Sequence, residues 1–173
     1  MLKALENCGQ VEIYHSFTPQ PLRFICSAFN FFTLHLFKIR FDYRHSRIMR
    51  KSLGKYYSKY LEQKAYDFAV VSGSTSIAAG IKTNVPVIYI NDRSLEGAMN
   101  YHKVLTQLFG FSYRQSIETD RLAIAKSALT IFSSSWAADA AIKNNPAKAS
   151  QIKMFPFGAN LESIPPAPPV KSF

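Results

Sequence analysis

Four short apolar runs, each followed by a segment with turn-forming residues, constrain the fold of this chain more than any other feature. The runs cover residues 67–71, 85–90, 129–132 and 152–155. The segments between them have room for one or two helices each, which is the pattern of βαβ units around a buried parallel sheet. We therefore predict a Rossmann-like α/β fold, in which helices cover both faces of a parallel sheet. Ligands of such sheets bind at the carboxyl ends of the strands, so the residues after each run are the candidates for function.

Capping residues and apolar spacing predict the helices around these strands. The predicted helices between the runs cover residues 74–81, 96–109, 115–127 and 135–144, with Gly110-Phe111-Ser112 separating the second from the third. Before the first run, the sequence predicts a helix end at residues 1–7, a strand at 11–14, and helices over 24–37 and 43–64. In the first of these two helices, one face carries Ile25, Phe29, Phe32 and Leu36. Residues 1–160 are predicted to form one domain, and the proline-rich residues 161–173 are predicted to be a linker.

The helix over residues 43–64 carries most of the excess positive charge. Residues 38–64 hold nine of the 21 Lys and Arg residues and only two acids, in a chain with a net charge of +10. One side of the helix is basic and the other apolar; the basic side comprises Arg44, Arg47, Lys51, Lys55 and Lys59, and the apolar side Met49, Leu53, Tyr56 and Tyr60. Three interpretations stay open: a solvated surface, a footprint on an anionic membrane, and a nucleic-acid contact, for which no recognised motif is present.

Composition excludes several classes of protein. The 173 residues are 47% hydrophobic, which is enough for one domain with a core and argues against disorder. The two cysteines, Cys8 and Cys26, provide neither a disulfide framework nor a zinc motif, and no metal site is predicted. No signal peptide follows Met1, and the longest apolar stretch is too short and too polar to span a bilayer. We expect a cytoplasmic chain, and a peripheral position on the inner face of the membrane stays open.

Motifs after the predicted strands occur in an order that resembles a known family. They are Val71-Ser72-Gly73-Ser74 with Ile77-Ala78, then Val85–Asp92, Glu118 within a helix, Ile131–Ala138, and Met154–Asn160. Their order and spacing resemble the N-terminal domain of family 4 (group 1) retaining glycosyltransferases, which have the GT-B fold. The resemblance covers residues 60–165.

This resemblance implies the acceptor-side half of an enzyme that transfers a hexose from a nucleotide-sugar to a glycan or a lipid-linked acceptor. A second domain holds the donor in such enzymes, so this chain alone is expected to bind no cofactor and to be inactive. The sequence departs from the family pattern where Asn91 and Ser135 replace a frequent His and Glu. It also shows neither the family's first strand nor its glycine-rich loop. A different class stays open: a stand-alone binding module that docks through its basic helix on an anionic membrane or nucleic acid.

Asp92 is the candidate catalytic or acceptor-binding residue, because a carboxylate at the end of a buried strand can accept hydrogen bonds from sugar hydroxyls. The alternative is a cap for residues 93–95. The resemblance implies further acceptor-binding or cleft residues, namely Gly73, Ser74, Asn91, His102, Glu118, Ser134, Ser135, Gly158 and Asn160. Turn and capping roles are the alternatives for Gly73 and the serines, and a hinge is the alternative for Gly158 and Asn160. Trp136 is predicted to lie in the core.

Overall fold

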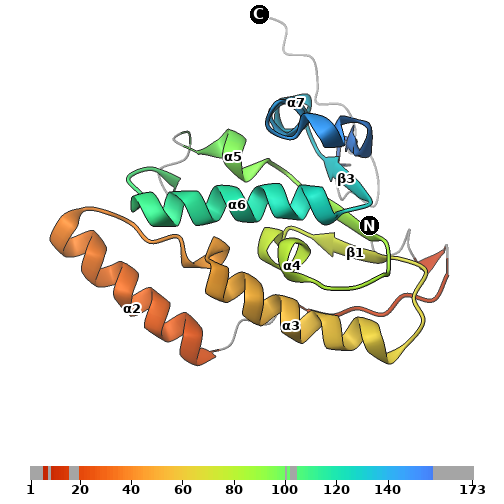
Figure 1. Ribbon diagram of the computed structural model, residues 1–173, viewed down its shortest axis with the longest axis horizontal. Coiled ribbons are helices and arrows are strands. Elements are labelled where there is room, and N and C mark those ends of the chain that lie inside the picture. Colours follow the sequence, from red (N-terminus) through yellow and green to blue (C-terminus); the bar gives the residue numbers. More distant parts are fainter. Residues whose placement is uncertain (1–5, 8, 16–19, 100, 102–104, 158–173) are drawn as a thin grey trace, which may run out of the picture.

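Figure 1 shows the computed structural model of the chain, which describes residues 6, 7, 9–15, 20–99, 101 and 105–157. The predicted helix end at residues 1–5, the site candidates His102, Gly158 and Asn160, and the proline-rich linker lie outside the described residues. The described part consists of a layer of helices packed on a parallel sheet (Figure 1).

Four strands form one sheet at the places that the apolar runs predict. They are β1 (Ala69–Ser72), β2 (Val87–Asn91), β3 (Leu129–Phe132) and β4 (Ile152–Met154). All neighbouring strands are parallel, and they are ordered as in the sequence, β1-β2-β3-β4. The β-branched and aromatic residues of these runs favour such half-buried or buried pleated strands. The predicted α/β fold with a Rossmann-like parallel sheet is confirmed.

In the described part of the chain, the helices that connect the strands are α4 (Thr75–Gly80), α5 (Leu95–Ala98), α6 (Gly110–Lys126) and α7 (Ser135–Asn144), and a 3₁₀ segment, η3 (Pro146–Gln151), precedes β4. Right-handed crossovers between strands in sequential order leave every connecting helix on the same face of the sheet. The side chains agree with this, since Tyr89 and Phe132 pack under the helices, whereas Ile88 and Ile131 on the other face are only half-buried. We predicted helices on both faces of the sheet, and the described helices cover one face.

The connection between β2 and β3 differs from the prediction. The helix expected over residues 96–109 is limited to the four-residue α5 in the described part, and α6 begins at Gly110 rather than at Gln115. Residues 110–112 therefore form the first turn of α6 instead of a break. Ser112 is buried in this turn, and its hydroxyl accepts a hydrogen bond of 2.9 Å from the backbone N–H of Asp42. A tertiary contact thus extends the helix beyond the boundary that local propensity indicated.

Within residues 20–68, three helical segments precede the sheet, namely α2 (Gln20–Phe37), the 3₁₀ turn η1 (Tyr43–His45) and α3 (Arg47–Gln63). Both predicted helices are confirmed, but the second is divided at Ser46, whose hydroxyl accepts a hydrogen bond from the Met49 N–H and caps α3. The predicted apolar side of α3 is partly wrong, because Tyr57 is buried there while Tyr56 is exposed. Of the described helices, none is both long and apolar enough to cross a membrane.

Residues 11–14 do not form the predicted strand. Glu12 makes an ion pair with Lys64 and accepts a hydrogen bond of 2.7 Å from the Tyr66 hydroxyl. The ring of Tyr14 packs against that of Tyr60, with 4.8 Å between their centroids. These contacts hold the segment beside the end of α3 instead of in the sheet. Among the described strands, β1 accordingly pairs with β2 alone.

The backbones of α3 and α4 touch where the two helices cross, at Gly54 and Gly80. A Cβ atom on Gly54 would lie 2.2 Å from the carbonyl oxygen of Gly80. A Cβ atom on Gly80 would lie equally close, at 2.2 Å, to the carbonyl oxygen of Arg50. Neighbouring side chains at the crossing, among them Leu53 and Ile77, belong to the largest buried apolar cluster of the described residues. The crossing therefore fixes the position of the helix layer that covers β1 and β2.

Candidate functional site

The carboxyl ends of β1, β2 and β3 bring three of the predicted loops to one edge of the sheet. Gly73 follows β1, Asp92 follows β2 and Ser133 follows β3. The Gly73 N–H donates a hydrogen bond of 2.9 Å to the carbonyl oxygen of Ile90, and the Ser133 hydroxyl donates one of 3.3 Å to the carbonyl oxygen of Asp92. The loops are therefore joined into one continuous edge, at the position where parallel sheets bind their ligands.

Asp92 presents an exposed carboxylate at this edge. The capping role that was its alternative belongs to Ser94, whose hydroxyl accepts a hydrogen bond from the Gly97 N–H at the start of α5. The backbone of Asp92 is held in place, because its N–H donates a hydrogen bond of 3.0 Å to the side-chain oxygen of Asn91. None of the side-chain hydrogen bonds and ion pairs within the described residues uses the Asp92 carboxylate. It remains accessible to a ligand.

Asn91 positions this loop through a buried hydroxyl. Its side-chain NH₂ donates a hydrogen bond of 2.6 Å to the hydroxyl of Tyr89, which in turn lies 2.8 Å from the hydroxyl of Thr75 on α4. Tyr89 is fully buried, and burial together with the neighbouring Asp120 raises the pKa of its hydroxyl above the ordinary value. Because an amide cannot act as a general acid or base, the contribution of Asn91 here is its hydrogen bond to the backbone N–H of Asp92.

The small residues of the edge have mostly local roles. Gly73 has a φ of +69°, a left-handed conformation that favours glycine, and its N–H is already engaged by Ile90. Ser134 caps α7 by accepting a hydrogen bond of 3.3 Å from the Ala137 N–H. Ser74 precedes α4 without forming a side-chain cap, and Ser135 is the exposed first residue of α7. Capping, the alternative for the serines, therefore applies to Ser134.

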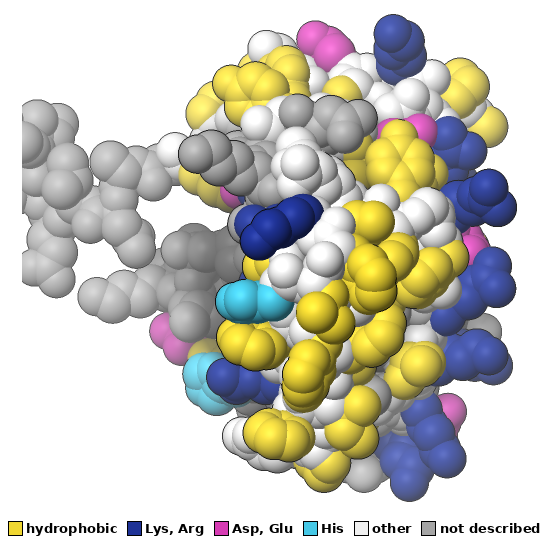
Figure 2. Space-filling model, turned by 90° about the vertical axis from the view of Figure 1, so that its left-hand side faces the viewer, with side chains coloured by type: hydrophobic (Ala, Val, Ile, Leu, Met, Phe, Trp, Pro, Cys, Tyr) yellow, Lys and Arg dark blue, Asp and Glu magenta, His cyan; other side chains and the backbone are white. Residues whose placement is uncertain are grey.

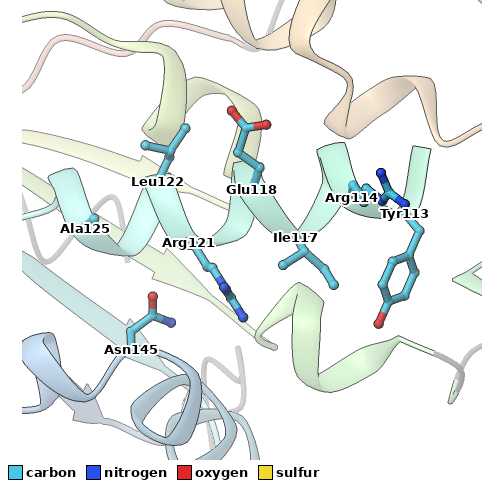
Figure 3. Close-up of a pocket in the computed structure, with 8 residues that line it drawn as sticks. All are labelled: Tyr113, Arg114, Ile117, Glu118, Arg121, Leu122, Ala125 and Asn145. Carbon is cyan, nitrogen blue, oxygen red and sulfur yellow. The ribbon is translucent and has the colours of Figure 1, made fainter. Parts of the chain in front are cut away.

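Glu118 does not join Asp92 at the strand ends. It lies in the middle of α6, where its carboxylate pairs with Arg47 at 2.7 Å and with Arg50 at 3.0 Å, both on α3. These two guanidinium groups hold the pKa of Glu118 below its usual value. Glu118 also lines a pocket of about 470 Å³. The other lining residues come from α6, apart from Asn145, which follows α7 (Figure 3). Its lining contains none of the residues that follow the strands.

Two exposed aromatic side chains complete the edge, and the sequence-based reasoning missed both. Trp136, predicted to lie in the core, is 47% exposed in the first turn of α7, directly after the loop that follows β3. Tyr101 follows α5 and is 76% exposed. Their ring centroids lie 5.9 Å apart. A signal was present in the sequence, because a tryptophan in a helix's first turn next to a strand end lies at the ligand-binding edge of a parallel sheet.

Asp120 of α6 is a buried carboxylate that holds the start of α5, directly after the Asp92 loop. Its carboxylate accepts hydrogen bonds of 2.9 Å from the Ser94 hydroxyl and 3.0 Å from the Glu96 N–H, so it tethers α6 to α5. The side chain is 1% exposed, and its second oxygen, Oδ1, has no partner within the described residues. Burial raises the pKa of Asp120 above its usual value, although these hydrogen bonds oppose the shift.

This raised pKa predicts how Asp120→Asn changes stability with pH. Below the pKa of the unfolded chain, about 3.9, Asp120 is protonated in both states. As the pH rises, the unfolded chain ionises first, so the folded protein loses stability until the folded pKa is passed. The difference in unfolding free energy between Asp120→Asn and wild type should therefore move in favour of the variant from pH 3.5 to pH 6, as measured by urea unfolding. A difference that is constant, or that moves toward the wild type, would contradict a raised pKa.

Comparison with known proteins identifies no relative, since no family model, curated protein or solved structure matches this chain. Within the residues that the structure describes, no group of three or more His, Cys, Asp or Glu side chains is placed to hold a metal ion. The site therefore has to be interpreted from its own chemistry: an accessible carboxylate, a fixed loop and a pair of exposed aromatic rings.

Proposed function

We propose that the chain is the acceptor-side domain of a retaining GT-B glycosyltransferase and that it binds a saccharide at the carboxyl edge of its sheet. The observation that carries this proposal is the pair of exposed rings, Tyr101 and Trp136, at the same edge as the accessible carboxylate of Asp92. Sugars offer hydroxyl groups that donate to a carboxylate, and their C–H faces are apolar enough to pack on aromatic rings. The order of the motifs at this edge, which resembles that of group 1 glycosyltransferases, supports the same conclusion.

In this proposal, the chain's part in catalysis is to bind and orient the saccharide acceptor. A hydroxyl group of the saccharide donates a hydrogen bond to the Asp92 carboxylate, and this bond orients the hydroxyl oxygen. A separate domain holds the nucleotide-sugar, and the hexose passes to the glycan or lipid-linked acceptor in the cleft between the two, where water is excluded. The 173-residue chain alone should therefore bind saccharides and should not turn over any nucleotide-sugar.

A binding experiment with matched controls tests this proposal. Wild-type protein applied to an array of immobilised glycans of defined structure should retain a subset of them. Asp92→Asn should weaken that binding by about tenfold or more, because a hydrogen bond to a charged group is worth about 1.5–3 kcal/mol. Trp136→Ala should weaken it to a similar extent. Two variants serve as controls. Asp139→Asn removes an exposed carboxylate on α7, outside the Asp92 loop, and Phe68→Ala removes an exposed ring before β1.

Two outcomes would reject the proposal. One is binding that the Asp92 and Trp136 variants leave unchanged, and the other is the absence of any retained glycan from wild-type protein that is folded by circular dichroism. Transfer of sugar from a nucleotide-sugar by the purified chain would contradict the division of labour between two domains.

A second candidate function, docking on an anionic surface, is favoured by the basic side of α3. Lys51, Lys55 and Lys59 are exposed, and none of the ion pairs among the described residues involves them. Arg47 differs, since it pairs with Glu118, and Arg44 lies in η1 before the helix begins. Replacing the three lysines with Gln should abolish binding to anionic lipid vesicles or nucleic acid if this side of α3 is the docking surface.

A further inference from the structure

Helix α2 directs most of its large apolar side chains away from the rest of the protein. Among the side chains of α2 that the structure describes, the buried ones are Cys26, which is 8% exposed, and Thr33, which is 5% exposed. Between them, Asn30 accepts a hydrogen bond of 2.8 Å from the backbone N–H of Phe41. Six large apolar side chains of the helix are between 58% and 75% exposed, namely Phe24, Ile25, Phe31, Phe32, Leu36 and Phe37. A helix that lies on a protein surface in water normally has the opposite arrangement.

The position of α2 is fixed by an aromatic cluster. Phe29 packs edge-on against Phe41 with 5.4 Å between ring centroids, and Phe41 lies 5.7 Å from Phe111 in the first turn of α6. Phe109 stacks on Phe111 at 5.5 Å. Because Phe111 is itself about half exposed, the apolar surface continues from α2 onto α6. Figure 2 shows this face of the molecule, on which hydrophobic side chains gather in one patch.

Lys and Arg side chains outnumber Asp and Glu around the patch (Figure 2). Residues 13–41 contain no Asp or Glu, and Arg23, Lys38 and Arg40 stand within or just after α2. In Figure 2, Lys and Arg side chains form a column along one margin of the hydrophobic patch. A second copy of the chain on this patch would bring like charges together, with no acidic residues of this segment to pair with them. A surface that is apolar inside and anionic at its boundary matches both features of the patch.

We propose that α2 lies flat in the interfacial region of a membrane containing anionic lipids, with the six exposed apolar side chains directed into the acyl boundary. One side of α2 is packed on the protein through Cys26, Asn30 and Thr33, so the helix cannot cross the bilayer and lies along its surface. With 18 residues, it extends over about 27 Å of that surface. The proposal uses no residue of the carboxyl edge and does not rest on saccharide binding.

Sedimentation with lipid vesicles tests this inference. The wild-type chain should bind vesicles that contain one quarter phosphatidylglycerol in phosphatidylcholine at least about tenfold more strongly than pure phosphatidylcholine vesicles. The double variant Phe31→Ser/Phe32→Ser should bind the anionic vesicles at least about tenfold more weakly than wild type, because each buried Phe contributes about 1.5–3 kcal/mol. The double variant Phe68→Ser/Phe155→Ser removes two exposed rings outside α2 and should bind like wild type.

A parallel variant separates α2 from α3. Lys51→Gln/Lys55→Gln/Lys59→Gln should change the binding by less than about threefold if α2 provides the main contact. If the triple variant loses vesicle binding and Phe31→Ser/Phe32→Ser keeps it, the proposal is overturned in favour of α3. Analytical ultracentrifugation in lipid-free solution tests for self-association. If the wild-type chain forms dimers that Phe31→Ser/Phe32→Ser dissociates, and does not bind vesicles, the proposal is overturned in favour of self-association. Equal binding to neutral and anionic vesicles would contradict a contribution of the positive charges to binding.

Discussion

Replacing Gly54 with alanine is expected to lower the free energy of unfolding by about 3 kcal/mol or more, because overpacking against backbone cannot be relieved by a rotamer change. The added methyl group would lie 2.2 Å from the carbonyl oxygen of Gly80, so α3 and α4 would have to move apart. The gain in helix propensity, about 1 kcal/mol, offsets only part of this cost. Urea unfolding followed by circular dichroism measures the difference.

Gly110→Ala is the matched control for this substitution. Gly110 is also a helical glycine, at the start of α6, but no atom lies within 4 Å of the position that its Cβ would occupy. This variant should be neutral or more stable than wild type by about 0.5–1 kcal/mol. Equal effects of the two substitutions would show that α3 and α4 do not cross in backbone contact.

Phe132→Ala is expected to have a similarly large effect, a loss of about 3–5 kcal/mol, because it removes a large side chain from a packed interior. Phe132 is 0% exposed and packs with Ile124, Ala137 and Ile152, which come from α6, α7 and β4. The small alanines around it cannot fill the space that the ring leaves. The measurement is again urea unfolding.

Phe155→Ala provides the control, since Phe155 follows β4 and its ring is largely exposed. Its backbone N–H donates a hydrogen bond of 2.8 Å to the carbonyl oxygen of Phe132, and alanine keeps this bond. The expected change is within about 0.5 kcal/mol. If Phe155→Ala is as damaging as Phe132→Ala, the order of buried and exposed faces in the sheet is wrong.

The strands were predictable because each is a short, mainly apolar run that is followed by serine, asparagine or proline. The predicted segments 67–71, 85–90, 129–132 and 152–155 contain or overlap all four strands of the described sheet. Residues 11–14 have the same local character, yet their partners are Lys64 and Tyr66, some fifty residues away. Four alternating residues cannot distinguish a strand from an extended segment held by side chains, so this prediction was wrong.

The candidate site was predictable in position but not in detail. The predicted strand ends place the loops of Gly73, Asp92 and Ser134 together, because the carboxyl ends of parallel strands lie at one edge of a sheet. Whether Asp92 or Ser94 caps α5 depends on a shift of two residues in the start of the helix, which lies within the usual uncertainty of helix boundaries. The exposure of Trp136 depends on how α7 packs, and an apolar residue type alone indicates burial.

The face of α2 shows the same limit. The spacing of Ile25, Phe29, Phe32 and Leu36 predicts a helix correctly, but periodicity does not tell what covers an apolar side. In the structure, all four are exposed by nearly half or more. The side chains that α2 turns toward the protein, Cys26 and Thr33, would not be selected as a packing face from the sequence.

The central claim is that the carboxyl edge of the sheet binds a saccharide, and amide chemical-shift mapping tests it most directly. ¹⁵N-labelled protein would be titrated with the methyl glycosides of glucose, galactose and mannose at millimolar concentrations. At least one glycoside should shift the amide signals of residues 72–74, 91–94 and 133–136 together and saturably, and Asp92→Asn should reduce these shifts. Saturable shifts confined to the pocket along α6, or no saturable shifts with any of the three, would contradict the claim.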